Sequence, residues 1–337
     1  MSTAAAKQLV EPTEPWRGIG AVDMVRGFAL FGVMLVNMYN FGASSPAWTA
    51  PYDEFAFSVK RFLFETKSFR LFSFLFGLGF ALQMLRAEQS QAGFLAFYLR
   101  RLIVLLAIGT VHTLLYDGDI LNYYAELGLI LLLFRRVPPK ALLAVATILI
   151  MAWPVERAVK LVRDGPREVA PREVRVQAAR ERLRENQQQH PYSVGSIGDV
   201  VARNARVIRL VAYTDYEGPE SALPIFAMFL LGLYAGRRSI VQDLEVHQPF
   251  IRRIRGWGLA IGLFGMTGER VLNSTVGYEV YSQAHEATVL QQLAGDTLFA
   301  VGSTALCLGY AAVIALLAQE VRWKRVLSPL GAVGRMA

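Results

Sequence analysis

The stretch RLIVLLAIGTVHTLLYDGDILNYYAELGLILLLFRR, residues 101–136, decides the class of fold. Two apolar runs meet at the acidic turn Asp117-Gly118-Asp119, each run ends in arginine at its other end, and the first carries His112. This pattern predicts a helical hairpin in a membrane. A helix rises about 1.5 Å per residue, so His112 lies about 16 Å beyond Arg101, near the middle of a hydrocarbon core about 30 Å thick. Titratable groups at that depth are costly and usually functional.

The composition of the whole chain also indicates a membrane protein. Of its 337 residues, 54% are hydrophobic and 18% are charged, and the mean hydropathy is +0.34. The net charge of +8 is typical of arginines held at an inner membrane surface, so we expect a lipid bilayer and no nucleic acid as partner. The single cysteine, Cys307, excludes an intrachain disulfide, and no Cys/His spacing predicts a metal site.

Eight apolar runs predict an all-α, polytopic transmembrane bundle of about eight helices. The runs cover about residues 19–41, 57–85, 102–116, 120–134, 141–155, 222–236, 256–268 and 296–318. If the N-terminus is cytoplasmic, five basic clusters fall on the inner side, at residues 17–26, 86–101, 135–140, 237–255 and 322–325. We therefore expect a multi-pass protein of the bacterial inner membrane.

The chain divides into five expected regions. Residues 1–18 form a cytoplasmic tail, 19–155 a five-helix membrane half with the hairpin, 156–221 an extracytoplasmic charged loop with amphipathic helices, 222–320 three further membrane helices, and 321–337 a cytoplasmic segment and the start of a further helix. The spacings Gly232-x-x-x-Gly236 and Gly258-x-x-x-Gly262 predict close helix approach.

Several polar residues are expected near the depth of His112 or beyond it. Asn37 lies eleven residues beyond Arg26 and therefore near His112 in depth. Arg70 lies sixteen residues before Arg86, about 24 Å from the inner boundary, where it needs a partner. The hairpin turn is the candidate partner. Its arms are short, so the turn is expected below the outer surface, where it would line a polar cavity that opens outward.

The residues expected at this cavity are His112, Asn37, Asp117, Asp119, Tyr123, Arg70 and Lys67. A histidine oriented by a carboxylate suits general-base catalysis. A structural histidine bonded across helices fits the same spacing. Glu217 is placed near the outer ends of the helices, either as a contact for an acceptor or as a solvated loop charge.

Four stretches are similar to one known family. They are VDMVRGFALFGVMLVNMYNF (22–41), FRLFSFLFGLGFALQ (69–83), the hairpin (100–136) and MFLLGLYAGRR (228–238). Together they resemble the YeiB-like family of bacterial inner-membrane proteins. PLGAVGRMA (329–337) is similar to the start of that family's C-terminal domain, whose remaining helices are expected beyond residue 337.

The family's first helix also resembles that of transmembrane acyltransferases, which include heparan-α-glucosaminide N-acetyltransferase and the acyltransferase-3 proteins. This resemblance implies transfer of an acyl group from cytoplasmic acyl-CoA, as co-substrate, to an extracytoplasmic glycan or lipid-linked acceptor. The implied donor-phosphate contacts are Arg26, Arg100 and Arg101. His112 would take the acceptor's proton, Asp119 would orient His112, and Asn37 would stabilise the oxyanion.

A proton-coupled transporter of a small anionic or lipid-like substrate fits the same groups. His112 and Asp119 would then relay protons, and Arg70 or Lys67 would contact the anion. An internal repeat or interrupted helices would favour transport, and the sequence shows neither clearly. A membrane scaffold that binds a partner through the outer loop is a third hypothesis, and a homo-oligomer is compatible with all three.

Overall fold

The computed structural model describes residues 17–41, 51–90, 93–116, 120–165, 195–205, 222–276 and 288–336. Within these ranges the chain is helical and has no strand, as predicted. Helical segments that are long and apolar enough to cross a membrane are Gly20–Met38, Ser58–Glu88, Phe94–Leu115, Pro139–Asp164 and Val289–Leu317. The protein is therefore a multi-pass helical membrane protein.

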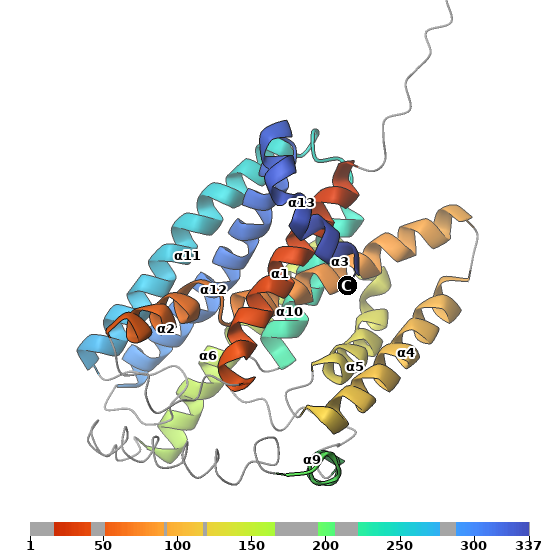
Figure 1. Cartoon of the computed structure of the whole chain (residues 1–337). Coiled ribbons are helices and arrows are strands. Elements are labelled where there is room, and N and C mark those ends of the chain that lie inside the picture. The colour runs from red at the N-terminus through yellow and green to blue at the C-terminus, as the bar shows by residue number, and fades with distance from the viewer. Residues whose placement is uncertain are drawn as a thin grey trace, which may run out of the picture.

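The helices pack as a bundle (Figure 1). In chain order they are α1 (Arg17–Phe41), α2 (Pro51–Leu63), α3 (Lys67–Ser90), α4 (Phe94–Leu115), α5 (Leu121–Leu131), the 3-10 helix η1 (Leu132–Arg136), α6 (Pro139–Asp164), α9 (Ile197–Ala205), α10 (Ala222–Arg237), α11 (Gln248–Val276), α12 (Val289–Leu317) and α13 (Val321–Met336). Each predicted apolar run falls on one of these helices, except that α2 and α3 divide the second run and α5 and η1 divide the fourth. Several helices begin earlier than predicted, because backbone hydrogen bonding continues through polar residues that end an apolar run.

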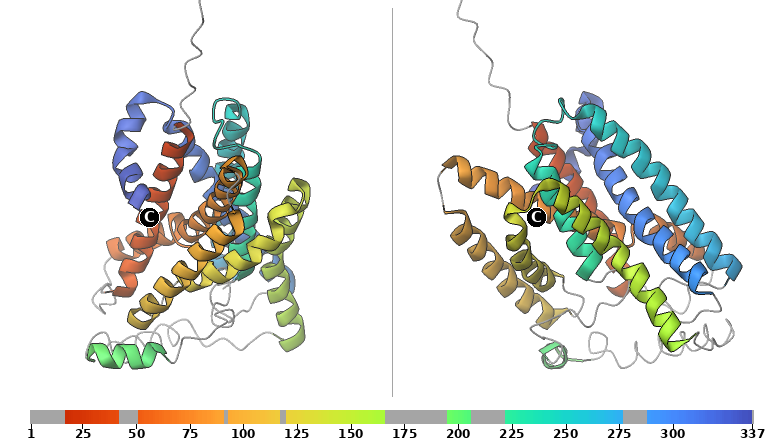
Figure 2. Two further views of the ribbon diagram at one scale, coloured as in Figure 1. Left: turned by 90° about the vertical axis from the view of Figure 1, so that its right-hand side faces the viewer. Right: turned by 180° about the vertical axis from the view of Figure 1, so that it is seen from behind.

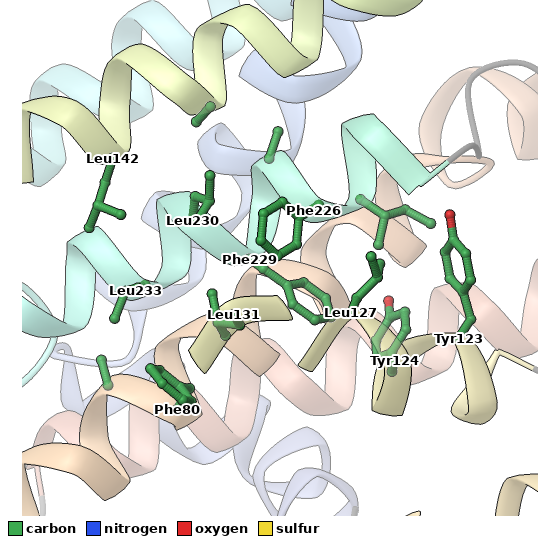
Figure 3. Close-up of a cluster of buried hydrophobic side chains, with 14 of the residues drawn as sticks. Phe80, Tyr123, Tyr124, Leu127, Leu131, Leu142, Phe226, Phe229, Leu230 and Leu233 are labelled. Carbon is green, nitrogen blue, oxygen red and sulfur yellow. The ribbon is translucent and has the colours of Figure 1, made fainter. Parts of the chain in front are cut away.

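The central helix of the bundle is α10, which is buried along most of its length. Its side chains Phe226, Phe229 and Leu230 lie among residues of α3, α5 and α6 (Figure 3). The contact with α3 is close, because a methyl group on Gly232 would lie 2.0 Å from the carbonyl oxygen of Phe74. Only a residue without a side chain permits that approach.

The α11 and α12 helices run side by side (Figure 2). Glycines line their contact, and a methyl group on Gly262 would lie 2.7 Å from the β-carbon of Leu306. Gly258 faces Ala305 and Gly309 in the same way. The close approach predicted from both glycine spacings is confirmed.

The predicted hairpin corresponds to α4 and α5, which pack against each other. The side chain of Asn122 donates from Nδ2 to the hydroxyl of Thr113 at 2.9 Å. Nearer the other end, the hydroxyl of Tyr98 donates to the carbonyl oxygen of Gly128 at 3.2 Å. The turn at residues 117–119 lies outside the described residues.

Two further helices lie against the bundle. On α9, the amide of Asn204 donates to the carbonyl oxygen of Leu114 at 3.3 Å, which docks α9 on the end of α4. Residues 321–336 form one helix, α13, with Pro329 inside it. It crosses α1 closely, because a methyl group on Gly27 would lie 2.0 Å from the carbonyl oxygen of Leu330.

Candidate functional site

The second membrane span is interrupted inside the bundle. The α2 helix ends at Leu63, α3 begins at Lys67, and residues 64–66 form a turn between them. Thr66 adopts a φ of 68°, a left-handed conformation that is rare for a β-branched residue. Thr66 and Lys67 are each only 1% exposed. Non-helical backbone within a membrane span is tolerated where protein covers it. The N-terminal end of α3 therefore brings polar groups into the interior of the bundle.

Arg70 lies in the first turn of α3 and is 1% exposed. Its Nη1 atom donates to the carbonyl oxygen of Ala300 at 3.0 Å and to the hydroxyl of Thr304 at 2.9 Å. It also donates to the hydroxyl of Ser303. All three acceptors belong to α12. The acidic turn predicted to pair with Arg70 lies outside the described residues, and α12 supplies the partners that the structure describes.

Lys67 lies beside the same face of α12. Its Nζ atom donates to the carbonyl oxygen of Arg61 at 3.1 Å and lies 5.7 Å from the centre of the Phe299 ring. The carboxylates of Glu65 and Glu269 are near enough to act on it electrostatically. Lys67 and Arg70, which the sequence placed together, therefore form one buried charged centre between α3 and α12.

A buried ion pair that the sequence analysis missed lies next to this centre. The Nε atom of Arg157, on α6, is 3.2 Å from a carboxylate oxygen of Asp296, on α12, and the Asp296 side chain has no exposed surface. The predicted helix on α6 stopped at residue 155, and the predicted helix on α12 began at Asp296. The pattern that would have revealed Asp296 is its place on one helical face with Phe299 and Ser303, at spacings of three and four residues.

His112 lies elsewhere. It is on an exposed face of α4, where its ring meets that of Tyr116 edge-on at 5.7 Å between centres. The α4 helix lies at the opposite edge of the bundle from α11 and α12 (Figures 1 and 2). The structure thus places His112 apart from the charged centre formed by Lys67 and Arg70.

The structure describes two more of the residues predicted for the cavity. Asn37 is half-buried near the end of α1. Tyr123 is buried in the apolar cluster that surrounds α10 (Figure 3). Its neighbour Tyr124 lies in the same cluster and also bonds to α3, with its hydroxyl 2.6 Å from that of Ser73, one helical turn beyond Arg70.

The three arginines predicted to meet donor phosphates lie on α1 and α4. Arg26 donates to the carboxylate of Asp23 and to the carbonyl oxygen of Gly334, each at 3.0 Å. Arg101 lies over the Phe76 ring at 5.9 Å and is close enough to Arg26 for their charges to interact. Arg100 is exposed beside Phe97, with 5.7 Å between the guanidinium and the ring centre.

Three predicted site residues, Asp117, Asp119 and Glu217, lie outside the described residues. The catalytic and substrate-binding roles assigned from the sequence stay predictions. In the part of the chain that the structure describes, no group of three or more His, Cys, Asp or Glu residues could hold a metal ion.

Comparison with known proteins places this fold in a family. The chain is 31% identical over 351 residues to the uncharacterized protein YxaH of Bacillus subtilis (strain 168), a match that covers 97% of this chain and 80% of YxaH. Residues 235–337 match the family described as "Protein of unknown function (DUF418)". The chain belongs to the YeiB-like DUF418 family. A shorter match, 33% identical over 118 residues, covers 32% of this chain and 29% of the uncharacterized protein YeiB of Escherichia coli (strain K12).

Another relative of this DUF418 protein is an uncharacterized 39.9 kDa protein, encoded in the amylase 3' region of Bacillus acidopullulyticus. It is 36% identical over 137 residues, which is 40% of this chain and 38% of that protein. No solved structure matches the chain. The names of these relatives state no activity, so the function of this DUF418 protein is inferred from its own residues.

Proposed function

We propose that this DUF418 protein is a proton-coupled transporter of a small anionic substrate, which it binds at Lys67 and Arg70. The observation that carries this proposal is the interruption between α2 and α3 inside the second span. Transporters commonly form substrate sites from discontinuous membrane helices, whose positive N-terminal ends point at anionic groups. Here the first turn of α3 adds two buried cations to such an end.

The surroundings of Lys67 support an anion site. Its ammonium group donates to the carbonyl of Arg61 and lies near the ring of Phe299, and the carboxylates of Glu65 and Glu269 also act on it. A buried cation in a medium of low polarity attracts an anion more strongly than one in water. Glu269 is buried on α11 and acts electrostatically on Lys67, so protonation of its carboxylate would be felt at the anion site.

The test is uptake by the purified full-length protein in sealed lipid vesicles that enclose a pH-sensitive dye. Radiolabelled succinate, glutamate and phosphate are offered one at a time. We expect one of them to enter together with protons. We expect Lys67→Met to abolish this uptake and Lys140→Met, at an exposed position on α6, to preserve it. Uptake that is equal in protein-free vesicles, or equal in the two variants, would exclude transport through Lys67.

Acyl transfer is a second candidate function, because the charges of Arg26 and Arg101 act on each other, as contacts for the phosphates of one acyl-CoA would require. The acceptor would be an extracytoplasmic glycan or lipid-linked molecule. Purified full-length protein is incubated with labelled acetyl-CoA and a lipid or glycan extract, and wild type is compared with His112→Ala. Transfer that the substitution leaves unchanged would remove His112 from the mechanism. If no acyl group is transferred and the protein takes up an anion in vesicles, the result favours transport over acyl transfer.

The proposed orientation has the N-terminus in the bacterial cytoplasm and the segment that follows α6, residues 165–221, outside the inner membrane. A cysteine placed at Gln188, in a chain that carries Cys307→Ala, should react in intact cells with a reagent that cannot cross the membrane. Protection of this cysteine in intact cells, with reaction after lysis, would contradict the orientation.

A further inference from the structure

The buried ion pair between Arg157 and Asp296 lies on the outer side of the Lys67 and Arg70 centre in the proposed orientation. Asp296 is seven residues before Ser303 on α12, which corresponds to about 10 Å along the helix. Asp296 and Ser303 belong to the buried face of α12. Arg157 is less buried than Asp296, because 13% of its side chain is exposed, compared with none of the Asp296 side chain.

Two aromatic rings connect the ion pair with the charged centre. The guanidinium of Arg157 lies 5.5 Å from the centre of the Trp153 ring. Trp153 meets Phe299 at an angle of 65°, with 6.1 Å between ring centres. The Lys67 ammonium lies 5.7 Å from the centre of that same Phe299 ring. One cation, two rings and a second cation thus follow one another from the ion pair toward α3.

We propose that Arg157 is an outer binding residue for the anionic substrate and that Asp296 is the internal anion that occupies Arg157 until the substrate displaces it. The inference deepens the proposed transport function and rests on it. A buried guanidinium needs a negative partner, and its planar donors suit any carboxylate or phosphate. An incoming anion that takes the place of Asp296 at Arg157 is then separated from Lys67 by the rings of Trp153 and Phe299.

A purely structural ion pair and a competing internal anion predict different results. If the ion pair only holds α6 against α12, removal of either charge weakens the same contact. Both removals should then change anion binding in the same direction. If Asp296 competes with the substrate, removal of its charge frees Arg157 and raises anion binding. Removal of the Arg157 charge lowers anion binding. An increase in anion binding on removal of the Asp296 charge, with no increase on removal of the Arg157 charge, is therefore the mark of competition.

Trp153 allows a direct measurement, because it lies beside Arg157. The other four of the five tryptophans, Trp16, Trp48, Trp257 and Trp323, are replaced by phenylalanine in the full chain. Fluorescence quenching of Trp153 is then measured with iodide, which is an anion, and with acrylamide, which is neutral. The comparison uses the Trp153-only protein, Asp296→Asn, Asp296→Glu and Arg157→Gln, and each variant is first checked for monodispersity and cooperative thermal unfolding. Asp296→Ser replaces Asp296→Asn if the latter does not fold.

We expect the iodide quenching constant to rise several-fold in Asp296→Asn and to stay at the low level of a buried tryptophan in Arg157→Gln, because Trp153 is only 2% exposed. Asp296→Glu should keep the value of the parent protein, and acrylamide quenching should be the same in all four. An unchanged iodide constant in Asp296→Asn would overturn the proposal, and so would an equal rise in acrylamide quenching, since that reports general loosening. This readout needs no transport activity. If no anion uptake is seen in vesicles but the iodide quenching constants change as expected, the transport function is excluded and an anion-binding site at Arg157 stands.

Discussion

The guanidinium of Arg70 donates to the hydroxyl of Thr304 at 2.9 Å, which joins the first turn of α3 to the middle of α12. Thr304 does not depend on this bond, because its hydroxyl also donates to the carbonyl oxygen of Ala300 at 2.8 Å. Ser303 likewise donates to the carbonyl oxygen of Phe299. Both hydroxyls would stay hydrogen-bonded without the arginine. Because a buried cation is costly to desolvate, we attribute its presence here to the proposed anionic substrate and not to fold stability.

Arg70→Met should therefore fold and lose function. Methionine fills a similar volume and leaves the α12 hydroxyls paired within their own helix, so we expect a melting temperature close to that of wild type. Arg70→Ala should be less stable than Arg70→Met by about 2 to 5 kcal/mol, because it leaves a cavity. Thermal unfolding in detergent and anion uptake in vesicles measure the two effects. If Arg70→Met unfolds as easily as Arg70→Ala, the polar bonds to α12 carry the stability and the functional explanation fails.

Gly77→Ala should separate α3 from α10. A methyl group at Gly77 would lie 1.9 Å from the carbonyl oxygen of Phe229, so the helices must move apart. Overpacking of this kind costs about 1 to 3 kcal/mol or more, and we expect a clear fall in melting temperature. Gly79→Ala is the matched control on the same helix, because nothing lies within 4 Å of its added methyl group. Equal melting temperatures for the two variants would show that the α3 and α10 contact is looser than described.

The sequence predicted the helical class, the hairpin and the close glycine contacts because each leaves a local pattern. Apolar runs mark the spans, and glycines four residues apart lie on one helix face. The bounds of α12 were predicted less well, because the apolar run was taken to begin at Asp296. A charged residue ends an apolar run, and a helix can continue through it when a partner such as Arg157 is available.

The partners of the charged residues could not be predicted from local pattern. Arg70 and its acceptor Ala300 are 230 residues apart in the chain, and their contact depends on how α3 and α12 pack. The break before Lys67 was also missed, because the run 57–85 was taken as one helix through Glu65 and Thr66. Depth counting predicted that Arg70 lies within the membrane. It could not say on which side of the bundle His112 lies, since depth carries no information about helix order.

Gly334→Ala should release α13 from α1. The added methyl group would lie 1.9 Å from the carbonyl oxygen of Asp23, and the carbonyl of Gly334 is also the acceptor for Arg26. We expect residues 321–336 to become sensitive to protease while the membrane spans stay protected. The control is Gly20→Ala on α1, where the added methyl group meets nothing within 4 Å. Protection of α13 that is unchanged in Gly334→Ala would contradict the close crossing of the two helices.

The N-terminal end of α9 should respond to acid through Asp199. Its carboxylate accepts hydrogen bonds from the hydroxyl and the backbone N–H of Ser196, each at 2.8 Å, and its own N–H donates back to the Ser196 hydroxyl. The hydrogen bond from the Ser196 hydroxyl, followed by that from its backbone, lowers the pKa of Asp199 below its usual value. A carboxyl group whose pKa is lower in the folded state stabilises that state above its unfolded pKa, about 3.9, and loses this contribution as the pH falls through the folded value.

Hydrogen-exchange protection of residues 197–205, corrected for the intrinsic exchange rate, should therefore fall with acid in wild type. It should be low and independent of pH in Asp199→Asn. Asp164→Asn, at another exposed carboxylate, should keep the wild-type profile, and a profile that Asp199→Asn shares with wild type would show that this cap does not hold α9.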